Sequence, residues 1–252
     1  MIARYGFWNN RRYSLEKMTL QELIGAYFQY YAINAYLALG VVSAVLAVLY
    51  VTNWALAAIG IVLAALVYPL AWYVLHRNVL HGRFLYRSAL TAKLWKRIHY
   101  DHHQDPHDLG VLFGALYTTL PTVFLVTAPV GWLLNGLGGA AAAFSAGMFT
   151  TCFYEFAHCI QHLSYKPRNK LLLEMKTRHM EHHFHDEKGN YGITNFFWDK
   201  VCATYYRKTE RPRKSANVHN LGYDAAEAKK YPWVARLSGG IGLDNPRLRR
   251  QG

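Results

Sequence analysis

Histidine is the residue type in this chain that points most directly to chemistry. The chain has 13 histidines, and neutral imidazole is a good ligand for transition metals. Ten of the 13 fall into four short clusters. These clusters are His76 with His81, then His99 with His102 and His103, then His158 with His162, and last His179 with His182 and His183. Ten imidazoles brought together can fill the coordination spheres of two ions at about five nitrogens each. The clusters therefore predict a dinuclear metal site.

The spacing within the clusters suits helices. Each residue of an α-helix advances about 100° around the axis, so positions three or four apart share a face. All three imidazoles of an HxxHH box can therefore point to one side of a helix. His76 and His81 are five apart, or about 140°, and could reach one centre only if the helix ends or bends between them. Pro69 and Gly82 are consistent with a distorted helix end there.

Chance clustering is the alternative interpretation of each box. A single histidine pair on an interfacial helix is more often a hydrated surface pair than a ligand set. Two HxxHH boxes and two further pairs in one chain of 252 residues argue against chance. The other three histidines, His107, His185 and His219, lack a partner at ligand spacing. We expect them beside the site or on the surface.

Two long uncharged runs must position these clusters. Residues 24–75 and residues 109–154 contain no Asp, Glu, Lys or Arg, and each run is long enough to cross a hydrocarbon core of about 30 Å twice. Thr52–Asn53 and Asn135–Gly136 are the polar breaks near the middle of each run. The sequence predicts an all-α integral membrane protein with four transmembrane helices arranged as two hairpins. A cytosolic helical cap would hold the dinuclear His-rich metal site.

The net charge of +13 would suggest a nucleic-acid partner in a soluble protein, but its placement argues for topology. All 28 Lys and Arg lie outside the uncharged runs, 18 of them from Lys166 onward. By the positive-inside rule, both termini and all four clusters face the cytosol. The first 23 residues are polar and charged, and do not resemble a cleavable signal peptide. We expect a multi-pass protein of the bacterial inner membrane, or of the endoplasmic reticulum if the source is eukaryotic, with no nucleic-acid partner.

Composition divides the chain into three predicted parts. Residues 1–23 form a basic interfacial segment, residues 24–207 a membrane-embedded domain, and residues 208–252 a cytosolic extension. Residues 191–206 alternate aromatic rings with charges and are predicted to lie on the membrane surface over the site. The tail beyond Arg211 is charged and has little apolar periodicity, which predicts a loosely ordered extension.

The ligand chemistry favours a redox metal. A structural zinc ion needs only four ligands, and attack on an unactivated C–H bond needs a redox metal with dioxygen or a comparable cofactor. Iron suits that task, although zinc is also compatible with nitrogen ligands. A hydrolytic dinuclear zinc site is the rival interpretation, but such sites normally include bridging carboxylates, and the HxxHH boxes contain only Asp101 and Glu181. Four acids are candidate acceptors for imidazole N–H groups, namely Asp101, Glu155, Glu181 and Asp186. No side chain beyond the histidines is assigned a catalytic role.

Electrons for such chemistry must come from a partner. The chain has no credible flavin or nicotinamide fingerprint and no haem domain. Its three cysteines, Cys152, Cys159 and Cys202, form no CxxC pair, which predicts neither a disulfide framework nor an iron–sulfur cluster. We therefore expect an external electron donor.

The four boxes together resemble those of a known family. HRNVLH (76–81), HYDHH (99–103), HCIQH (158–162) and HMEHH (179–183) are similar, in this order, to the boxes of the fatty acid hydroxylase superfamily, and most closely to its fatty acid 2-hydroxylase branch. The resemblance covers roughly residues 70–207. YGITNFFWDKVCATYY (191–206) also resembles the stretch after the last box, although an aromatic-Gly-Thr is usual there where this chain has Cys-Ala-Thr. That departure bears on substrate fit.

The resemblance implies a four-span membrane enzyme with a dinuclear centre. It would use O2 to hydroxylate a lipid acyl chain at carbon 2, in a fatty acid or in the N-acyl chain of a ceramide or other sphingolipid. Cytochrome b5, ferredoxin or a similar separate protein would be the donor. Carried over box by box, the metal ligands would be His76, His81, His99, His102, His103, His158, His162, His179, His182 and His183.

Several other functions remain open at this point. A lipid desaturase could use the same oxidant, although membrane desaturases lack the separate HxxxH box in this position. Hydroxylases of sterols, sphingoid bases or carotenoids have related boxes. A metal transporter or sensor is the non-enzymatic alternative. The interiors of the uncharged runs contain no histidine, which argues against transport.

Overall fold

The computed structural model describes residues 13–240, and these are mostly helical and contain no β-strand beyond an isolated bridge between Ser14 and Asp108. The described chain divides into two compact units. The first contains Gln21–Trp72 and Gly114–Ala157, and the second contains residues 13–20, Tyr73–Phe113 and residues 158–240. Residues 1–12 of the predicted interfacial segment and residues 241–252 of the predicted extension lie outside the described residues.

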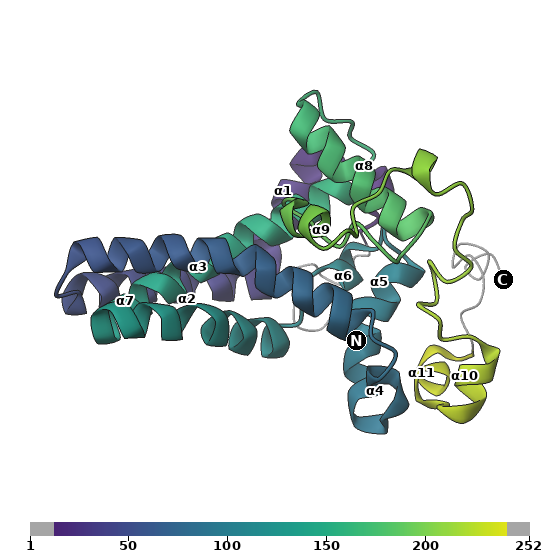
Figure 1. Cartoon of the computed structure of the whole chain (residues 1–252), viewed down its shortest axis with the longest axis horizontal. Helices are drawn as coiled ribbons and strands as arrows, with labels where there is room; N and C mark the ends of the chain where they lie inside the picture. Colours follow the sequence, from purple (N-terminus) through teal and green to yellow (C-terminus); the bar gives the residue numbers. More distant parts are fainter. Residues whose placement is uncertain (1–12, 241–252) are drawn as a thin grey trace. The chain divides into compact units, whose positions relative to one another are not determined.

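The first unit is built from long apolar helices. They are α1 (Leu20–Gln29), α2 (Tyr31–Tyr50), α3 (Trp54–Val74) and most of α7 (Leu116–His162). Within the described residues, three helical stretches are long and apolar enough to cross a membrane: Tyr31–Tyr50, Trp54–Leu80 and Leu109–His162. Ala47 of α2, Ala57 of α3, and Ala141 and Ala142 of α7 form a shared buried cluster, and the three helices lie side by side (Figure 1). Large apolar side chains such as Leu66 and Leu133 remain exposed, as suits helices in contact with lipid.

Helix α7 is interrupted near its middle. Asn135 (φ −151°, ψ 37°) and Gly136 (φ 53°, ψ −142°) are not helical, and the positive φ of Gly136 is a conformation that glycine adopts without strain. The Asn135 side chain accepts a hydrogen bond from the Thr52 amide (3.1 Å) and donates one to the Asn53 carbonyl (3.2 Å). Both polar breaks seen in the sequence are therefore turns, and a side-chain amide joins them.

Glycines let the two halves of α7 approach closely. A Cβ atom added at Gly131 would overlap the carbonyl of Gly139, and one added at Gly139 would overlap the carbonyl of Gly131. A Cβ atom at Gly138 would overlap the backbone of Tyr50. Backbone contact of this kind is typical of packed membrane helices.

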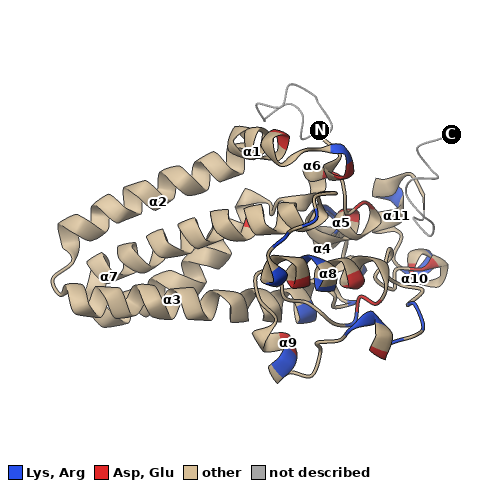
Figure 2. Ribbon diagram, turned by 90° about the horizontal axis from the view of Figure 1, so that it is seen from above, with Lys and Arg blue, Asp and Glu red and all other residues tan. Residues whose placement is uncertain are grey.

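The second unit contains short helices and most of the charge. Figure 2 shows that α2 and α3 lack charged residues, whereas α8 and α10 carry both signs. The helical elements of this unit are the end of α3 and the π-helical η3 (Leu75–Leu80), η4 (Leu85–Arg87), α4 (Ala89–Trp95), the π-helical η5 (Lys96–Tyr100), α5 (Asp101–Gln104), α6 (Leu109–Leu112), the end of α7, α8 (Lys170–Phe184), α9 (Phe197–Val201), η6 (Lys208–Glu210), α10 (Ala225–Lys230) and α11 (Trp233–Ser238), with η2 (Leu15–Lys17) near the start of the described chain. Asn169 caps α8 by accepting hydrogen bonds from the Leu171 and Leu172 amides.

The prediction of a loosely ordered tail beyond Arg211 is wrong for residues 211–240. This segment forms α10 and α11 and buries Tyr223 and Val234 in a core with Tyr86 and Trp95. The Tyr86 hydroxyl donates to Glu227. Tertiary packing stabilises these helices of six residues. A helix this short shows no extended apolar periodicity in the sequence, so the pattern did not predict it.

We predict that Gly139→Ala destabilises the protein by about 1–3 kcal/mol, because the new methyl group would overlap backbone that cannot easily move. The thermal unfolding midpoint in detergent should fall by several degrees. Gly25→Ala is the matched control, since nothing lies within 4 Å of a Cβ atom there. Equal midpoints for the two variants would contradict the close contact.

Candidate metal centre

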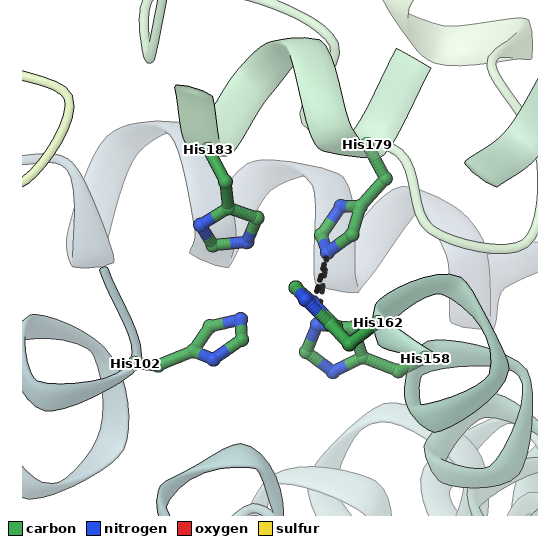
Figure 3. Close-up of side chains that lie close together, drawn as sticks. All are labelled: His102, His158, His162, His179 and His183. Carbon is green, nitrogen blue, oxygen red and sulfur yellow. Dashed lines mark hydrogen bonds between the residues drawn. The ribbon is translucent and has the colours of Figure 1, made fainter. Parts of the chain in front are cut away.

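All ten histidines of the four boxes belong to the second unit, and the structure gathers them into two adjoining groups. Within each group the candidate ligand atoms lie within 4.8 Å of one another. The first group contains His102, His158, His162, His179 and His183 (Figure 3), and the second contains His76, His81, His99 and His103. His182 forms a third, overlapping group with His103 and His183, one from each of the first two. We assign His182 to the second group, because its ring centroid is 4.9 Å from that of His76 and 4.8 Å from that of His81, against 5.2 Å from that of His183.

Each HxxHH box serves both groups. His99 and His103 belong to the second group, while His102 of the same box belongs to the first. In α8 the pattern is inverted: positions 179 and 183 belong to the first group, and position 182 packs with the second. Positions three and four after the first histidine differ by about 100° around a helix. The spacing allows all three imidazoles of a box to point to one side of a helix, and within that side this angle separates the members of the two groups.

A π-helical turn brings His76 and His81 together although they are five residues apart. The His81 amide donates to the His76 carbonyl (3.0 Å), an i→i+5 bond that brings residues five apart onto the same side. Their Nε2 atoms are 3.2 Å apart. The predicted distortion between these two histidines is therefore confirmed. A second π-helical segment, Lys96–Tyr100, leads into the second box.

The nitrogen spacing fits metal coordination. His179 Nε2 lies 3.0 Å from His158 Nε2 and 2.9 Å from His162 Nε2. Two nitrogens that bind the same ion, each at about 2.1 Å and with a right angle between the two bonds, lie about 3 Å apart. Among the described residues, the groups consist of histidines alone, and no Asp, Glu or Cys belongs to any of them. The donor set is thus all nitrogen, which suits first-row transition metals.

Backbone carbonyls fix the protonation of three imidazoles. His76 Nδ1 donates to the Tyr191 carbonyl (2.6 Å), His103 Nδ1 to the Val218 carbonyl (2.8 Å) and His182 Nδ1 to the Gly189 carbonyl (2.7 Å). A carbonyl can only accept, so Nδ1 carries the hydrogen and Nε2 keeps its lone pair.

Several ring nitrogens have no protein partner. In the described part of the chain, the Nε2 atoms of His99, His102, His103, His182 and His183 are buried without a hydrogen bond. Buried polar atoms are seldom left unsatisfied. Metal ions bound by these nitrogens would satisfy them.

Burial keeps the imidazoles in the form that binds metal. It lowers the pKa of His103 to about 3, and it holds the pKa of His99, His102 and His179 well below the ordinary value. Neighbouring imidazoles lower the pKa of these three further. At neutral pH these rings are uncharged, so no proton must leave before a metal binds.

Three of the acids proposed from the sequence do not bond to an imidazole. Their ion pairs are Asp101 with Lys96 (2.7 Å), Glu181 with Arg178, and Asp186 with Arg211 (2.5 Å). Asp101 and Glu181 each follow the first histidine of a box by two positions, or about 200°, so they lie on the opposite side of the helix. The fourth acid, Glu155, belongs to the first unit and accepts a hydrogen bond from the Gly114 amide (3.2 Å).

Two of the three remaining histidines touch the boxes through backbone. His107 Nδ1 donates to the His162 carbonyl (3.0 Å), and His219 Nδ1 to the His103 carbonyl (3.3 Å). His185 Nε2 lies 2.5 Å from the Arg211 carbonyl. We expected such positions beside the site for residues that lack a partner at ligand spacing.

Asp199 is a buried acid near the site whose role the sequence did not reveal. This side chain is fully buried and accepts hydrogen bonds from the Tyr191 amide (2.8 Å), the Gly192 amide (2.7 Å) and the Thr204 hydroxyl (2.7 Å). Burial raises its pKa, and these donors oppose that effect. An acid within the aromatic run NFFWDK was the available signal.

The comparisons with known proteins agree with this site. The family model for fatty acid hydroxylases matches residues 61–204, which is more than half of the chain and includes all ten clustered histidines. The chain belongs to the fatty acid hydroxylase family. A solved structure described as "Full length scs7p (only hydroxylase domain visible)" has a TM-score of 0.60 and 26% identity, and the match covers 73% of this chain and 68% of that one.

Similar proteins include named hydroxylases of the family. Ceramide very long chain fatty acid hydroxylase scs7 of Schizosaccharomyces pombe is 30% identical over 144 residues, which cover 54% of this chain and 39% of the relative. Fatty acid 2-hydroxylase of Rattus norvegicus is 28% identical, with coverage of 60% and 41%. Dihydroceramide fatty acyl 2-hydroxylase FAH2 of Arabidopsis thaliana is 31% identical, with coverage of 58% and 61%. The chain spans about two-fifths of the length of the first two relatives.

We predict that the metal-free protein loses stability as the pH falls from 7.5 to 5. The folded pKa values of His99, His102 and His103 lie below the unfolded value of 6.5. Between these values the unfolded chain binds more protons, so the free energy of unfolding decreases as the pH falls through 6.5. The slope is at most about 1.4 kcal/mol per pH unit for each such histidine. Thermal unfolding at several pH values measures it, and a constant midpoint over this range would contradict the buried neutral state.

Proposed function

We propose that this chain is an O2-dependent hydroxylase of lipid acyl chains that acts at carbon 2 of a fatty acid or of the N-acyl chain of a ceramide or other sphingolipid. The observation that carries the proposal is the cluster of ten histidines, nine of them buried, inside the segment matched to the fatty acid hydroxylase family. Relatives named fatty acid 2-hydroxylase and dihydroceramide fatty acyl 2-hydroxylase support the position of attack.

We propose two iron ions as the cofactor, with zinc as a substitute in purified protein. The first group would hold one ion, and the second group together with His182 would hold the other. When bound there, the two ions would supply the activation of dioxygen. The overall reaction breaks one C–H bond, places one oxygen atom on that carbon, and reduces the other oxygen to water with two electrons and two protons.

The chain's own residues prepare the site for this reaction. Neutral imidazoles present lone pairs, carbonyl acceptors orient three of them, and burial of the cluster keeps bulk water away. A separate donor such as cytochrome b5, ferredoxin or a similar protein would supply the electrons. Long-range attraction between an acidic donor and the many Lys and Arg residues would speed its association.

We propose a multi-pass membrane protein with four spans in two hairpins, and with both termini and the histidine cap in the cytosol. The break in α7 at Asn135–Gly136 supports counting Leu109–His162 as two passes. The proposed parts are residues 1–23 as an interfacial segment, 24–207 as the hydroxylase domain and 208–252 as a cytosolic extension. A bacterial inner membrane is our preferred location, with the endoplasmic reticulum as its eukaryotic counterpart.

We predict that His102→Ala and His183→Ala abolish lipid oxidation and lower the bound metal. Each change removes an imidazole of the first group, and the loss of a ligand typically removes the ion or distorts its geometry. The assay is mass spectrometry of total lipids from a host that lacks hydroxylated acyl chains and expresses the full chain with a donor. A gain of one oxygen at acyl carbon 2 is the expected product.

His185→Gln serves as the control, because His185 belongs to neither group and a glutamine amide can still donate to the Arg211 carbonyl. It should retain both product and metal. Retained activity in both His102→Ala and His183→Ala would refute the ligand assignment. A product that lacks two hydrogens would replace hydroxylation with desaturation, and bound metal with no lipid product would favour a sensor.

We predict that a membrane-impermeant maleimide labels Cys202 only from the cytosolic side. Cys202 is exposed, whereas Cys152 and Cys159 are buried, so a single site should react. Labelling is compared between inside-out and right-side-out vesicles, and Cys202→Ser should remove the signal. Labelling in right-side-out vesicles would overturn the proposed orientation.

A further inference from the structure

A short loop, residues 189–193, presents three carbonyls, two of them to imidazoles of the histidine cluster. The carbonyls of Gly189, Tyr191 and Ile193, which alternate along the chain, accept hydrogen bonds from the side chains of three other residues. The donors are His182 Nδ1 (2.7 Å), His76 Nδ1 (2.6 Å) and Gln161 Nε2 (2.7 Å), respectively. One backbone segment therefore orients two imidazoles that belong to different boxes.

The side chain of Asp199 holds this loop in place. Its two oxygens accept hydrogen bonds from the Tyr191 and Gly192 amides, which directly adjoin the carbonyl that orients His76. The Thr204 hydroxyl donates to the same carboxylate at 2.7 Å. Asp199 has no exposed surface, so water cannot replace these bonds if the carboxylate is removed.

The two histidine groups differ in this support. In the second group His76, His103 and His182 each donate Nδ1–H to a carbonyl. Within residues 13–240 no imidazole of the first group has such an acceptor. The Nδ1 atoms of His102, His162, His179 and His183 are buried without a partner there.

An outer acceptor on Nδ1 fixes the tautomer and the ring orientation of a ligand and makes it more basic, and loss of such an acceptor typically costs 10–100-fold in metal affinity. We infer that the two metal positions are unequal: the second group holds its ion tightly, the first group holds an exchangeable ion, and Asp199 is a positioning residue for the tight position. This inference rests on the proposed dinuclear centre.

Metal release tests the inequality without any lipid assay. The full chain in detergent is loaded with Zn²⁺, bound zinc is counted per chain, and excess colorimetric chelator is added. Two phases of equal amplitude are expected, one ion in each. His102→Ala should remove the fast phase and His76→Ala the slow phase, which assigns each phase to its group.

Asp199→Asn tests the positioning role. An asparagine keeps one acceptor oxygen but turns an NH2 group toward the other amide, so the loop loses part of its support. The slow phase should accelerate by about 10–100-fold, while the fast phase keeps its rate. Asp186→Asn is the matched control, since that carboxylate pairs with Arg211, and both of its phases should equal those of the unmodified chain.

Thr204→Val provides a second variant if Asp199→Asn does not fold. It removes the hydroxyl that donates to the carboxylate and that also bonds to the Tyr73 hydroxyl, and it should accelerate the slow phase alone, by a smaller factor. Release of both ions in one phase would overturn the inference, and so would equal acceleration of both phases by Asp199→Asn. Fewer than two zinc ions per unmodified chain would refute the dinuclear centre itself, a failure that the ion count separates from the others.

Discussion

The cost of burying nine imidazoles in one place, with the half-buried His81 beside them, is the constraint on which the second unit depends. A buried ring nitrogen must be satisfied, and a buried imidazolium would repel its neighbours. The structure meets this demand from two sides. Backbone carbonyls accept from Nδ1 of His76, His103 and His182. The Nε2 atoms of His158 and His162 lie about 3 Å from that of His179, a spacing that suits a shared metal ion.

Local helix geometry determines how the histidines of each box are placed in this cluster. A π-turn aligns His76 with His81, although a regular helix would separate them. The angle between positions three and four of a helix divides each HxxHH box between the two groups. Each HxxHH box thereby links the groups, so both groups receive histidines from the same two segments.

Segments outside the boxes complete the cluster. The loop at 189–193 and the Val218 carbonyl supply the acceptors, and the latter lies beyond residue 204, where the family match ends. Tyr223 and Val234 anchor the segment that carries Val218 by packing with Tyr86 and Trp95. The C-terminal part of the described chain thus contributes to the site through backbone atoms, whose role does not depend on a particular side chain at position 218.

The sequence by itself determined the helical class, the turns at Thr52–Asn53 and Asn135–Gly136, and which ten histidines gather, because apolar run length and box spacing are local properties. Only the tertiary structure decided how the histidines divide into two groups, because that division depends on where helices from distant parts of the chain meet. It also decided the outer acceptors. The sequence suggested carboxylates such as Asp101, but that residue faces Lys96. Backbone carbonyls accept hydrogen bonds from the imidazole N–H groups instead. Every residue has a carbonyl, so residue type cannot reveal which carbonyls do this.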